Sequence, residues 1–249
     1  MTEAERIKAK LKKERYKDTF FNIMVLLVFG GIVLWFIWNG GGYNPDKSLY
    51  VNYDLKTDLI PNPVQEDIPD ESFTIRKYGV DITITKLASY DITGKVEAIK
   101  DYSTNFFSNM LSFSASNMTD YISPRDLTLS WGDIALSENS NLIQADQNYL
   151  NSQRVVWYSY KGELKSKYGE DHILSHISNN HIIALDNGLR RQLQKVKTLD
   201  IVRIKGYLVD VKCSNGVTWG PSSLTRTDDG FHSCEILYAE DIVIMPKNK

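Results

Sequence analysis

The sequence lacks the short motifs that identify the commonest catalytic and cofactor sites. It contains no C-x-x-C or H-E-x-x-H ligand pattern for zinc, no G-x-S-x-G nucleophile elbow and no glycine-rich phosphate-binding loop. It has no internal repeat at any period. We therefore predict no cofactor, leave open whether the chain is an enzyme, and favour a non-enzymatic role.

Excess charge is also lacking, since the formal net charge of the 249 residues is −2. Residues 1–39 hold 7 basic and 4 acidic residues, which leaves 22 basic and 27 acidic residues, a net charge of −5, for the rest. An acidic domain exerts no overall attraction on nucleic acid. We predict no nucleic-acid partner.

Only one long hydrophobic run is present, Phe20 to Trp38, and it contains no charged residue. As a helix it would extend roughly 28 Å, close to the ~30 Å hydrocarbon core of a bilayer. We predict a transmembrane helix over residues 19–39. A cleaved signal peptide is the alternative, but the run is longer than an h-region and ends in the bulky Phe36, Ile37 and Trp38.

The flanks of this run predict its orientation. Residues 1–18 contain seven Lys or Arg, whereas the twenty residues from Asn39 to Asp58 contain only Lys47 and Lys56. Because basic residues stay on the cytoplasmic side, the segment 1–18 should be cytoplasmic and the C-terminal domain periplasmic or extracellular. The predicted location is the inner (plasma) membrane, with the run as a single-pass signal-anchor.

Cysteine is scarce, and both cysteines, Cys213 and Cys234, lie in the predicted outer domain. In an oxidising compartment a lone pair is most simply a disulfide bond. Two metal thiolates are the weaker alternative, because no regular ligand spacing accompanies them. We predict a Cys213–Cys234 disulfide.

Residues 40–71 are rich in glycine and proline, with Gly40–Gly42 followed by four prolines. This composition predicts an extended linker, although a segment packed over the domain surface would have the same sequence. We place the folded domain at residues 72–249.

Within that domain the hydrophobic pattern predicts mostly β-structure with one short helix. The period changes from 2 to 3.6 between Asn187 and Lys197, where Leu189, Leu193 and Val196 share a helical face. A helix between the third and fourth of five strands is typical of an OB-like β-barrel; a β-sandwich with one crossing helix is the alternative. The predicted strands lie near 90–100, 125–131, 154–160, 201–211 and 235–245.

Three of the four histidines fall in DHILSHISNNHII, and neutral imidazole is a common metal ligand. His172, His176 and His181 are therefore candidate metal ligands. The alternative is a polar loop with hydrogen-bonded histidines, because Asn179-Asn180 suggests a turn that would separate them.

The segment between the cysteines is a candidate binding loop. A loop closed at its base can hold side chains rigidly, and Trp and Arg are residue types that dominate protein interfaces. Its predicted binding residues are Trp219, Ser222, Ser223, Arg226 and Asp228. The structural alternative is that Arg226 and Asp228 pair while Trp219 closes the end of the barrel.

The polar residues around Trp131, including Asp126, Asp133 and Glu138, carry a weaker signal. They could lie near a site, but scattered carboxylates usually mark a solvated face. We predict no function for them.

Several blocks together resemble a bacterial exported or membrane-anchored family with no known activity. They are LTLSWGDIAL (Leu127–Leu136), SHISNNHII (Ser175–Ile183), VRIKGYLV (Val202–Val209) and SSLTRTD followed by Cys234. The resemblance covers roughly residues 90–245. It implies that these blocks belong to one domain.

The sequence therefore predicts a membrane-anchored binding or scaffolding subunit of a bacterial envelope assembly. Its predicted partners are the membrane and other envelope proteins, with a homo-oligomer left open. The alternatives are a metal-assisted envelope hydrolase that uses the histidines, and an oligosaccharide-binding barrel that rests on fold analogy.

Overall fold

The computed structural model of the chain describes residues 20–21, 23–31, 43–77, 79–102, 115–150, 154–225 and 234–246. They belong to two compact units, Met1–Gly42 and Tyr43–Lys249. In the first unit the described residues are helical and exposed. Within the described ranges, no helix has both the length and the apolar character needed to cross a membrane. The predicted segment 1–18 lies outside the described residues and the span 19–39 lies only partly within them, so the anchor stays a prediction.

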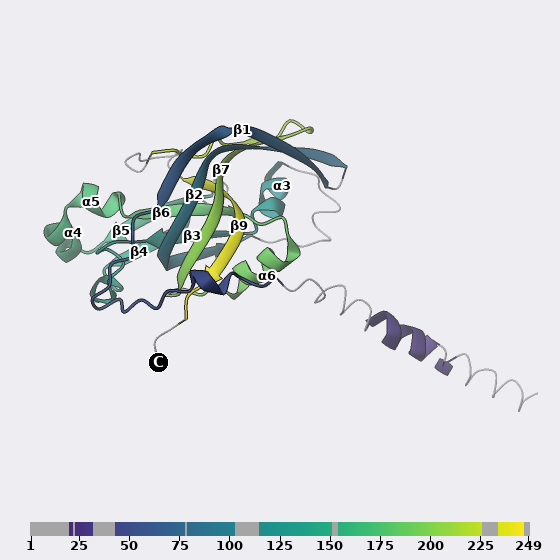
Figure 1. Ribbon diagram of the computed structural model, residues 1–249, viewed down its shortest axis with the longest axis horizontal. Helices are drawn as coiled ribbons and strands as arrows, with labels where there is room; N and C mark the ends of the chain where they lie inside the picture. Colours follow the sequence, from purple (N-terminus) through teal and green to yellow (C-terminus); the bar gives the residue numbers. More distant parts are fainter. Residues whose placement is uncertain are drawn as a thin grey trace, which may run out of the picture. The chain divides into compact units, whose positions relative to one another are not determined.

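The second unit is mostly β-structure, as the alternating patterns predict (Figure 1). Its larger sheet has seven strands in the order β1-β2-β3-β6-β9-β7-β8. These strands are Val64–Lys77 (β1), Val80–Asp101 (β2), Arg125–Ser130 (β3), Ile177–Ile183 (β6), Ile201–Cys213 (β7), Thr218–Trp219 (β8) and Glu235–Ile244 (β9). A smaller sheet pairs β4 (Ile143–Leu150) with β5 (Val155–Tyr160).

Strand β2 is long enough to pair with three neighbours. Its residues from Ile82 to Lys95 pair with β7, and those from Lys95 to Asp101 pair with β3. The series β2-β3-β6-β9-β7 therefore returns to β2. Every pairing in this series is antiparallel except that of β6 with β9, which is parallel.

Alternation of apolar residues along β2 and β7 produces the core. Ile82 and Ile84 are fully buried and pack with Val209 and Val211 of β7. Farther along, Ile92 of β2 belongs to a second buried cluster, with Leu127, Leu129, Ile182 and Leu237 from the strands that follow. Because buried side chains recur at every second residue, the predicted period of 2 is confirmed for these strands.

A close approach of β7 to β9 explains the glycine in the middle of β7. A Cβ atom at Gly206 would overlap the carbonyl oxygen of Tyr238, so no larger residue fits without moving β9. The pairing of the two strands shifts register between Lys205 and Gly206, which indicates a bulge.

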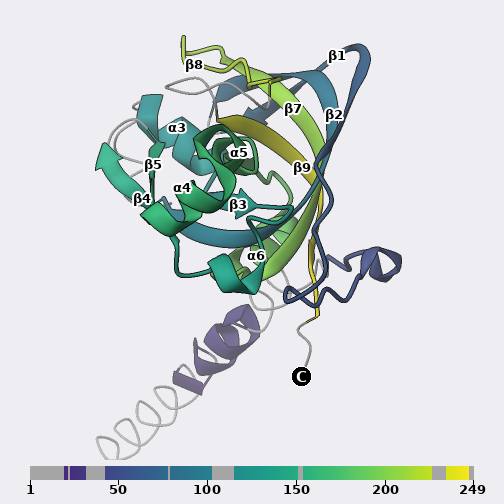
Figure 2. The same ribbon diagram turned by 90° about the vertical axis from the view of Figure 1, so that its left-hand side faces the viewer.

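Four α-helices accompany the strands in the described ranges: α3 (Ala115–Ile122), α4 (Gly162–Tyr168), α5 (Glu170–Leu174) and α6 (Asn187–Lys195). The prediction of a single helix is therefore wrong, but α6 is the helix that it located. Asp186 caps α6 by accepting hydrogen bonds from the backbone N–H groups of Gly188 and Leu189, at 2.7 and 3.0 Å. Figures 1 and 2 show α4, α5, β4 and β5 gathered at one end of the unit.

Residues 154–160, predicted as the third barrel strand, do form a strand, but they do not join the large sheet. That segment forms β5 in the smaller sheet, and the large sheet instead uses β6, which begins at Ile177. All seven β6 residues are buried, including Asn179, Asn180 and His181, where the sequence suggested a turn. The hydrophobic pattern of the sequence does not reveal this strand, because its polar side chains face buried partners instead of solvent.

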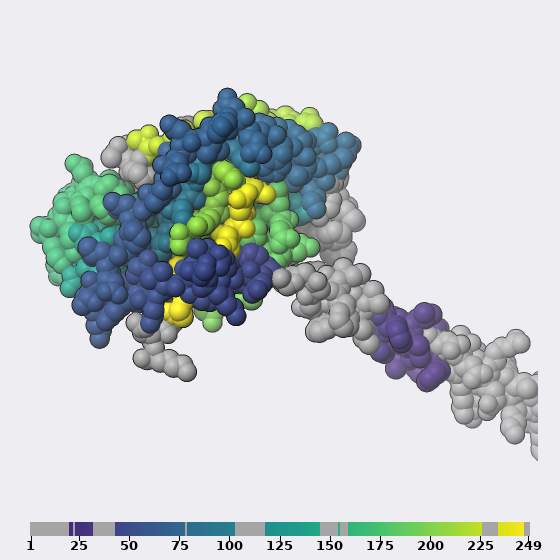
Figure 3. Space-filling view, viewed as in Figure 1, coloured from purple at the N-terminus to yellow at the C-terminus, as the bar shows by residue number. Residues whose placement is uncertain are grey.

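The predicted linker, residues 40–71, is packed from Tyr43 onward. The Tyr43 hydroxyl donates to the carbonyl of Ile242 (3.1 Å) and accepts from its N–H group (2.8 Å). Ile60 is 1% exposed and forms a bridge with Gly132. Figure 3 shows the dark blue chain of this region lying over the yellow strand β9. Of the two alternatives for this segment, packing over the domain surface is the one observed.

Strand β1 forms one edge of the large sheet, where, among the described strands, it pairs with β2 alone. Its pairing is interrupted between Asp67 and Glu71, a stretch that contains Pro69. Most of its residues are exposed.

Candidate functional site

Three adjacent strands bring the side chains of Asp126, His181 and Cys234 together. Asp126 on β3 and His181 on β6 are cross-strand partners in the antiparallel register. Cys234 immediately precedes β9, whose parallel pairing with β6 begins with Asn180 opposite Glu235. Asp126 and His181 are buried, at 1% and 4% exposure, and Cys234 is half-buried. With Arg154 and Tyr102 these residues form what we call the Asp126 cluster.

The carboxylate of Asp126 is the centre of the cluster. Its Oδ2 atom lies 2.8 Å from Nδ1 of His181 and accepts a hydrogen bond from the Tyr102 hydroxyl at 2.7 Å. Its Oδ1 atom accepts from Nη2 of Arg154, also at 2.7 Å. One buried anion therefore holds two cationic side chains and a phenol.

Arg154 connects the cluster to the aromatic residues around it. Its guanidinium lies 3.8 Å from the Tyr102 ring centroid and 4.9 Å from that of Trp219. Nη2 also donates to the carbonyl of Ser123 at 2.7 Å. The Arg154 backbone has φ of 52°, a conformation that non-glycine residues rarely adopt and that these contacts stabilise.

His181 also lies beside the Cys234 thiol, which contributes to raising the pKa of the imidazole. Because Nδ1 lies 2.8 Å from Asp126, Nε2 is the ring nitrogen available to the thiol. Nδ2 of Asn179 donates to the Cys234 sulfur at 3.7 Å. The Trp219 ring lies beside His181, with 5.3 Å between the ring centroids.

Charge in the cluster follows from these contacts. Burial alone lowers the pKa of His181, but the Asp126 carboxylate and the Cys234 side chain outweigh it and raise that pKa to about 9. Burial alone raises the pKa of Asp126, because it disfavours the charged carboxylate. The positive charges of His181 and Arg154 outweigh this effect and hold the pKa of Asp126 below its ordinary value. At neutral pH His181 is therefore an imidazolium paired with a carboxylate.

A thiol, an imidazole and a carboxylate in this order can perform nucleophilic chemistry. The carboxylate fixes the tautomer and orientation of the imidazole, and the imidazole exchanges a proton with the nucleophile. A neighbouring imidazolium also stabilises a thiolate, which is the reactive form of cysteine.

The three predicted histidine ligands are not one site. His172 and His176 lie together, with ring centroids 4.2 Å apart, and Asp133 contributes the third potential ligand atom there. His181 belongs instead to the Asp126 cluster. The predicted metal site is therefore wrong for His181, because this residue lies within β6, away from the preceding helix α5.

The predicted disulfide is not formed, because both cysteines are free thiols in the structure. Cys213 packs in the apolar core at the end of β7, whereas Cys234 faces His181 and Asn179. The pairing of β7 with β9 ends at Leu208 and Leu237, so it does not bring Cys213 opposite Cys234.

The predicted binding residues have different positions. Trp219 is half-buried against His181, in contact with the candidate site. Ser222 and Ser223 are buried, and the Ser222 hydroxyl accepts from the Ile236 N–H group at 2.9 Å, which is a structural role. Arg226 and Asp228 lie outside the described residues.

Sequence reasoning missed Asp126, Arg154 and Tyr102 as site residues. Asp126 was assigned to a solvated face, but it interrupts an apolar strand whose buried residues follow directly. A carboxylate within such a strand needs a buried partner, and this was the available signal.

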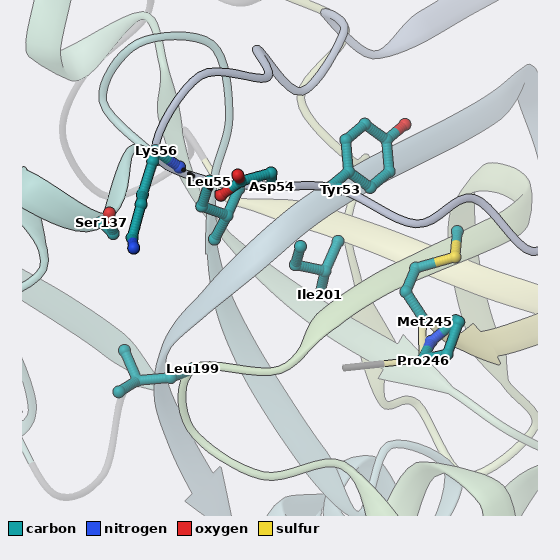
Figure 4. A pocket seen from close by; sticks show the side chains of 9 residues that line it. All are labelled: Tyr53, Asp54, Leu55, Lys56, Ser137, Leu199, Ile201, Met245 and Pro246. Atoms are coloured by element: carbon teal, nitrogen blue, oxygen red, sulfur yellow. Dashed lines mark hydrogen bonds between the residues drawn. The ribbon is translucent and has the colours of Figure 1, made fainter. Parts of the chain in front are cut away.

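A surface pocket of about 230 Å³ lies away from these groups (Figure 4). Its lining residues are Tyr53, Asp54, Leu55, Lys56, Ser137, Leu199, Ile201, Met245 and Pro246. Ligand sites usually occupy roughly 300–1,000 Å³, and this pocket contains neither a thiol nor an imidazole. The Asp126 cluster is therefore the better candidate for a functional site.

Comparison of the chain with protein-family models, with curated proteins and with solved structures finds no match.

Proposed function

We propose that the second unit, Tyr43–Lys249, is an OB-type β-barrel. The strand series β2-β3-β6-β9-β7 that returns to β2 supports this, as do the parallel β6–β9 pairing and the helix α6 between β6 and β7. Together these features give five strands with a helix between the third and fourth, although the third strand is β6 and not the predicted segment 154–160.

We propose that this domain is an envelope enzyme that transfers or hydrolyses acyl groups through Cys234. The observation that carries the proposal is that the His181 ring lies 2.8 Å from the Asp126 carboxylate and beside the Cys234 thiol, to which Asn179 Nδ2 donates at 3.7 Å. The membrane anchor predicted from the sequence would place the enzyme at the plasma membrane, with its domain outside. Its substrate class would be an amide or ester of the envelope.

The proposed reaction has two stages. The Cys234 thiolate attacks the carbonyl carbon, and the carbonyl oxygen becomes an oxyanion to which Asn179 Nδ2, 3.7 Å from the sulfur, can donate. The bond to the leaving nitrogen or oxygen breaks as Nε2 of His181 gives it a proton. A thioester remains on Cys234.

In the second stage water or an acceptor group attacks the thioester. Nε2 of the now neutral His181 takes the proton of the attacking group, and the carbon–sulfur bond breaks to release the thiolate. Asp126 stays ionised throughout, because its role is to orient and stabilise the imidazolium.

The test is a covalent adduct with a simple acyl donor. Incubating the full chain with p-nitrophenyl acetate should add one acetyl group to Cys234, located by mass spectrometry of the digested protein. The adduct should persist in Cys213→Ala and disappear in Cys234→Ala. A folded wild-type protein that shows no adduct, or one that acetylates equally at Cys213, contradicts the proposal.

A binding role is the second candidate function. Two exposed apolar residues favour it, one of them in the segment between the two cysteines. Val64 and Leu224 are 55% and 47% exposed, and Gln65 donates to the carbonyl of Leu224 at 3.1 Å. Apolar side chains grouped at a surface commonly mark an interaction site. This supports the envelope binding or scaffolding subunit predicted from the sequence; the oligosaccharide-binding alternative still rests on fold analogy.

Co-purification from gently solubilised native membranes tests the binding role. A partner protein should be retained in stoichiometric amount by the wild type and reduced at least tenfold by Leu224→Asp. The same substitution should leave acetylation of Cys234 unchanged, which separates the two functions. Isolation of the chain without any stoichiometric partner would argue against scaffolding.

A further inference from the structure

We propose that Asp133, His172 and His176 bind a divalent transition-metal ion such as Zn²⁺. One ligand atom from each residue lies within 4.8 Å of the others. This proposal is independent of the thiol chemistry, since none of the three residues belongs to the Asp126 cluster. In this site the carboxylate of Asp133 takes the place that the sequence analysis gave to His181.

Local structure positions the two histidines for this role. Both residues lie on one side of the short segment from α5 to the start of β6, where their rings stack with an interplanar angle of 24°. The Tyr168 ring stacks on His172 as well, with 5.6 Å between the ring centroids. The two imidazoles are therefore adjacent before any metal binds.

The tautomer of His176 also suits a ligand. Its Nδ1 atom lies 2.8 Å from the carbonyl oxygen of His172, and a carbonyl can only accept, so Nδ1 carries the proton. Nε2 is then left with the lone pair that a metal requires. Metal-bound histidines commonly have this second-shell hydrogen bond to a carbonyl.

Gly132 makes room for this ring beside the backbone. A Cβ atom there would lie 2.8 Å from Cδ2 and 3.4 Å from Nε2 of His176, and the glycine has φ of 62°. The adjacent Trp131 N–H group donates to the His176 carbonyl at 3.1 Å, which ties the two segments together. Asp133 follows directly in the chain and is thereby held next to the imidazoles.

The carboxylate completes the ligand set. Oδ1 of Asp133 lies 2.8 Å from Nε2 of His172. Ligand atoms around a tetrahedral zinc ion lie about 3.3 Å apart when the metal–ligand distances are about 2.0 Å. Binding would replace the proton between Asp133 and His172 by the metal, and small side-chain rotations would suffice. Three protein ligands leave the fourth position for water.

The half-exposed site is accessible to an ion from solvent. The side chains of His172 and Asp133 are 37% and 32% exposed. Two imidazoles and one carboxylate are typical of zinc and of other divalent first-row metals, whereas calcium and magnesium prefer oxygen ligands alone. We therefore expect selectivity for Zn²⁺ over Mg²⁺.

Zinc titration of the full chain tests the site. After removal of metals with a chelator, the protein should compete with a chromophoric zinc indicator and bind one equivalent of Zn²⁺. His172→Ala and Asp133→Asn should each weaken binding at least tenfold, because even loss of a second-shell partner costs 10–100-fold. His181→Gln serves as the matched control and should leave the affinity unchanged.

A thermal melt distinguishes loss of the site from loss of the fold. Zinc should raise the Tm of the wild type and of His181→Gln, and should leave that of His172→Ala unchanged. The metal-free melts of wild type and Asp133→Asn should coincide, since that substitution retains the shape of the side chain. Zinc binding that survives in the His172→Ala/His176→Ala double variant, or that no form of the protein shows, overturns the proposal.

Discussion

Asp126→Ala is expected to lower the free energy of unfolding by about 3–5 kcal/mol. The substitution removes the anion that contacts His181, Arg154 and Tyr102, at 2.8, 2.7 and 2.7 Å. The His181 imidazolium would then remain buried without its counter-charge, and Arg154 would keep only Asp120, whose Oδ1 lies 3.8 Å from Nη1. Removing one partner of a buried ion pair in this way is strongly destabilising. Chemical denaturation followed by circular dichroism measures the effect.

Asp81→Ala is the matched control, since Asp81 pairs with Arg76 at the surface, where both side chains are at least 45% exposed. Exposed pairs contribute about 0–1 kcal/mol, so this variant should be nearly as stable as the wild type. Asp126→Asn, which retains an acceptor for Tyr102, allows a measurement if the alanine variant does not fold. A loss below about 1 kcal/mol for both Asp126 variants would contradict an ionised pair with His181.

The same pair makes stability depend on pH. His181 has a pKa of about 9 in the folded chain and 6.5 ordinarily, so its contribution is complete below 6.5 and is lost as the pH rises to about 9. The difference corresponds to about 3 kcal/mol. The pKa of Asp126 is lowered from 3.8, so its contribution is present above that pH and is lost as the pH falls further. Stability should be greatest between these ranges, and the alkaline loss should be absent in Asp126→Asn.

His181→Gln is expected to slow alkylation of Cys234 by iodoacetamide about 100-fold near neutral pH. Glutamine preserves hydrogen bonding but cannot carry the positive charge that stabilises a thiolate. Acid–base assistance by a positioned side chain typically contributes 10²–10⁴-fold, and the lower value suits a reaction that needs only the thiolate. Stopped-time alkylation with mass spectrometry of the Cys234 peptide gives the rate.

The pH profile separates activation from simple exposure of the thiol. The wild-type rate should exceed the variant rate across neutral pH, and the two should converge above about pH 9, where His181 loses its proton and its positive charge. Asp81→Ala should follow the wild-type profile. Parallel profiles for wild type and His181→Gln would show that the imidazole does not control the thiol.

Much of the fold could be predicted because its strands alternate clearly. Strands β2 and β7 carry apolar residues at every second position, and α6 follows an aspartate cap with Leu189 and Leu193 on one face. Strand β6 could not be found in this way, because its polar residues are buried by partners from other strands. A pattern that assumes polar residues face water fails where a site is built inside a sheet.

The site was predicted only in pieces for a related reason. Sequence proximity grouped His181 with His172 and His176, but β6 carries it to a different neighbourhood, where it meets Asp126 and Cys234. The presence of only two cysteines in the predicted outer domain suggested a disulfide, but their number gives no information on where the strands place them. In both cases the pairing between strands decides which side chains meet.

The edge strand β1 has a consequence for how copies of this chain can meet. A long exposed edge presents unpaired backbone groups on which another strand can add and start aggregation. In β1 the carboxylates Glu66, Asp67, Asp70 and Glu71 surround Pro69, which lacks a backbone donor, at the point where the pairing with β2 is interrupted. Like charges on two such edges would repel, so β1 resists sheet-to-sheet growth and favours solubility in a crowded compartment.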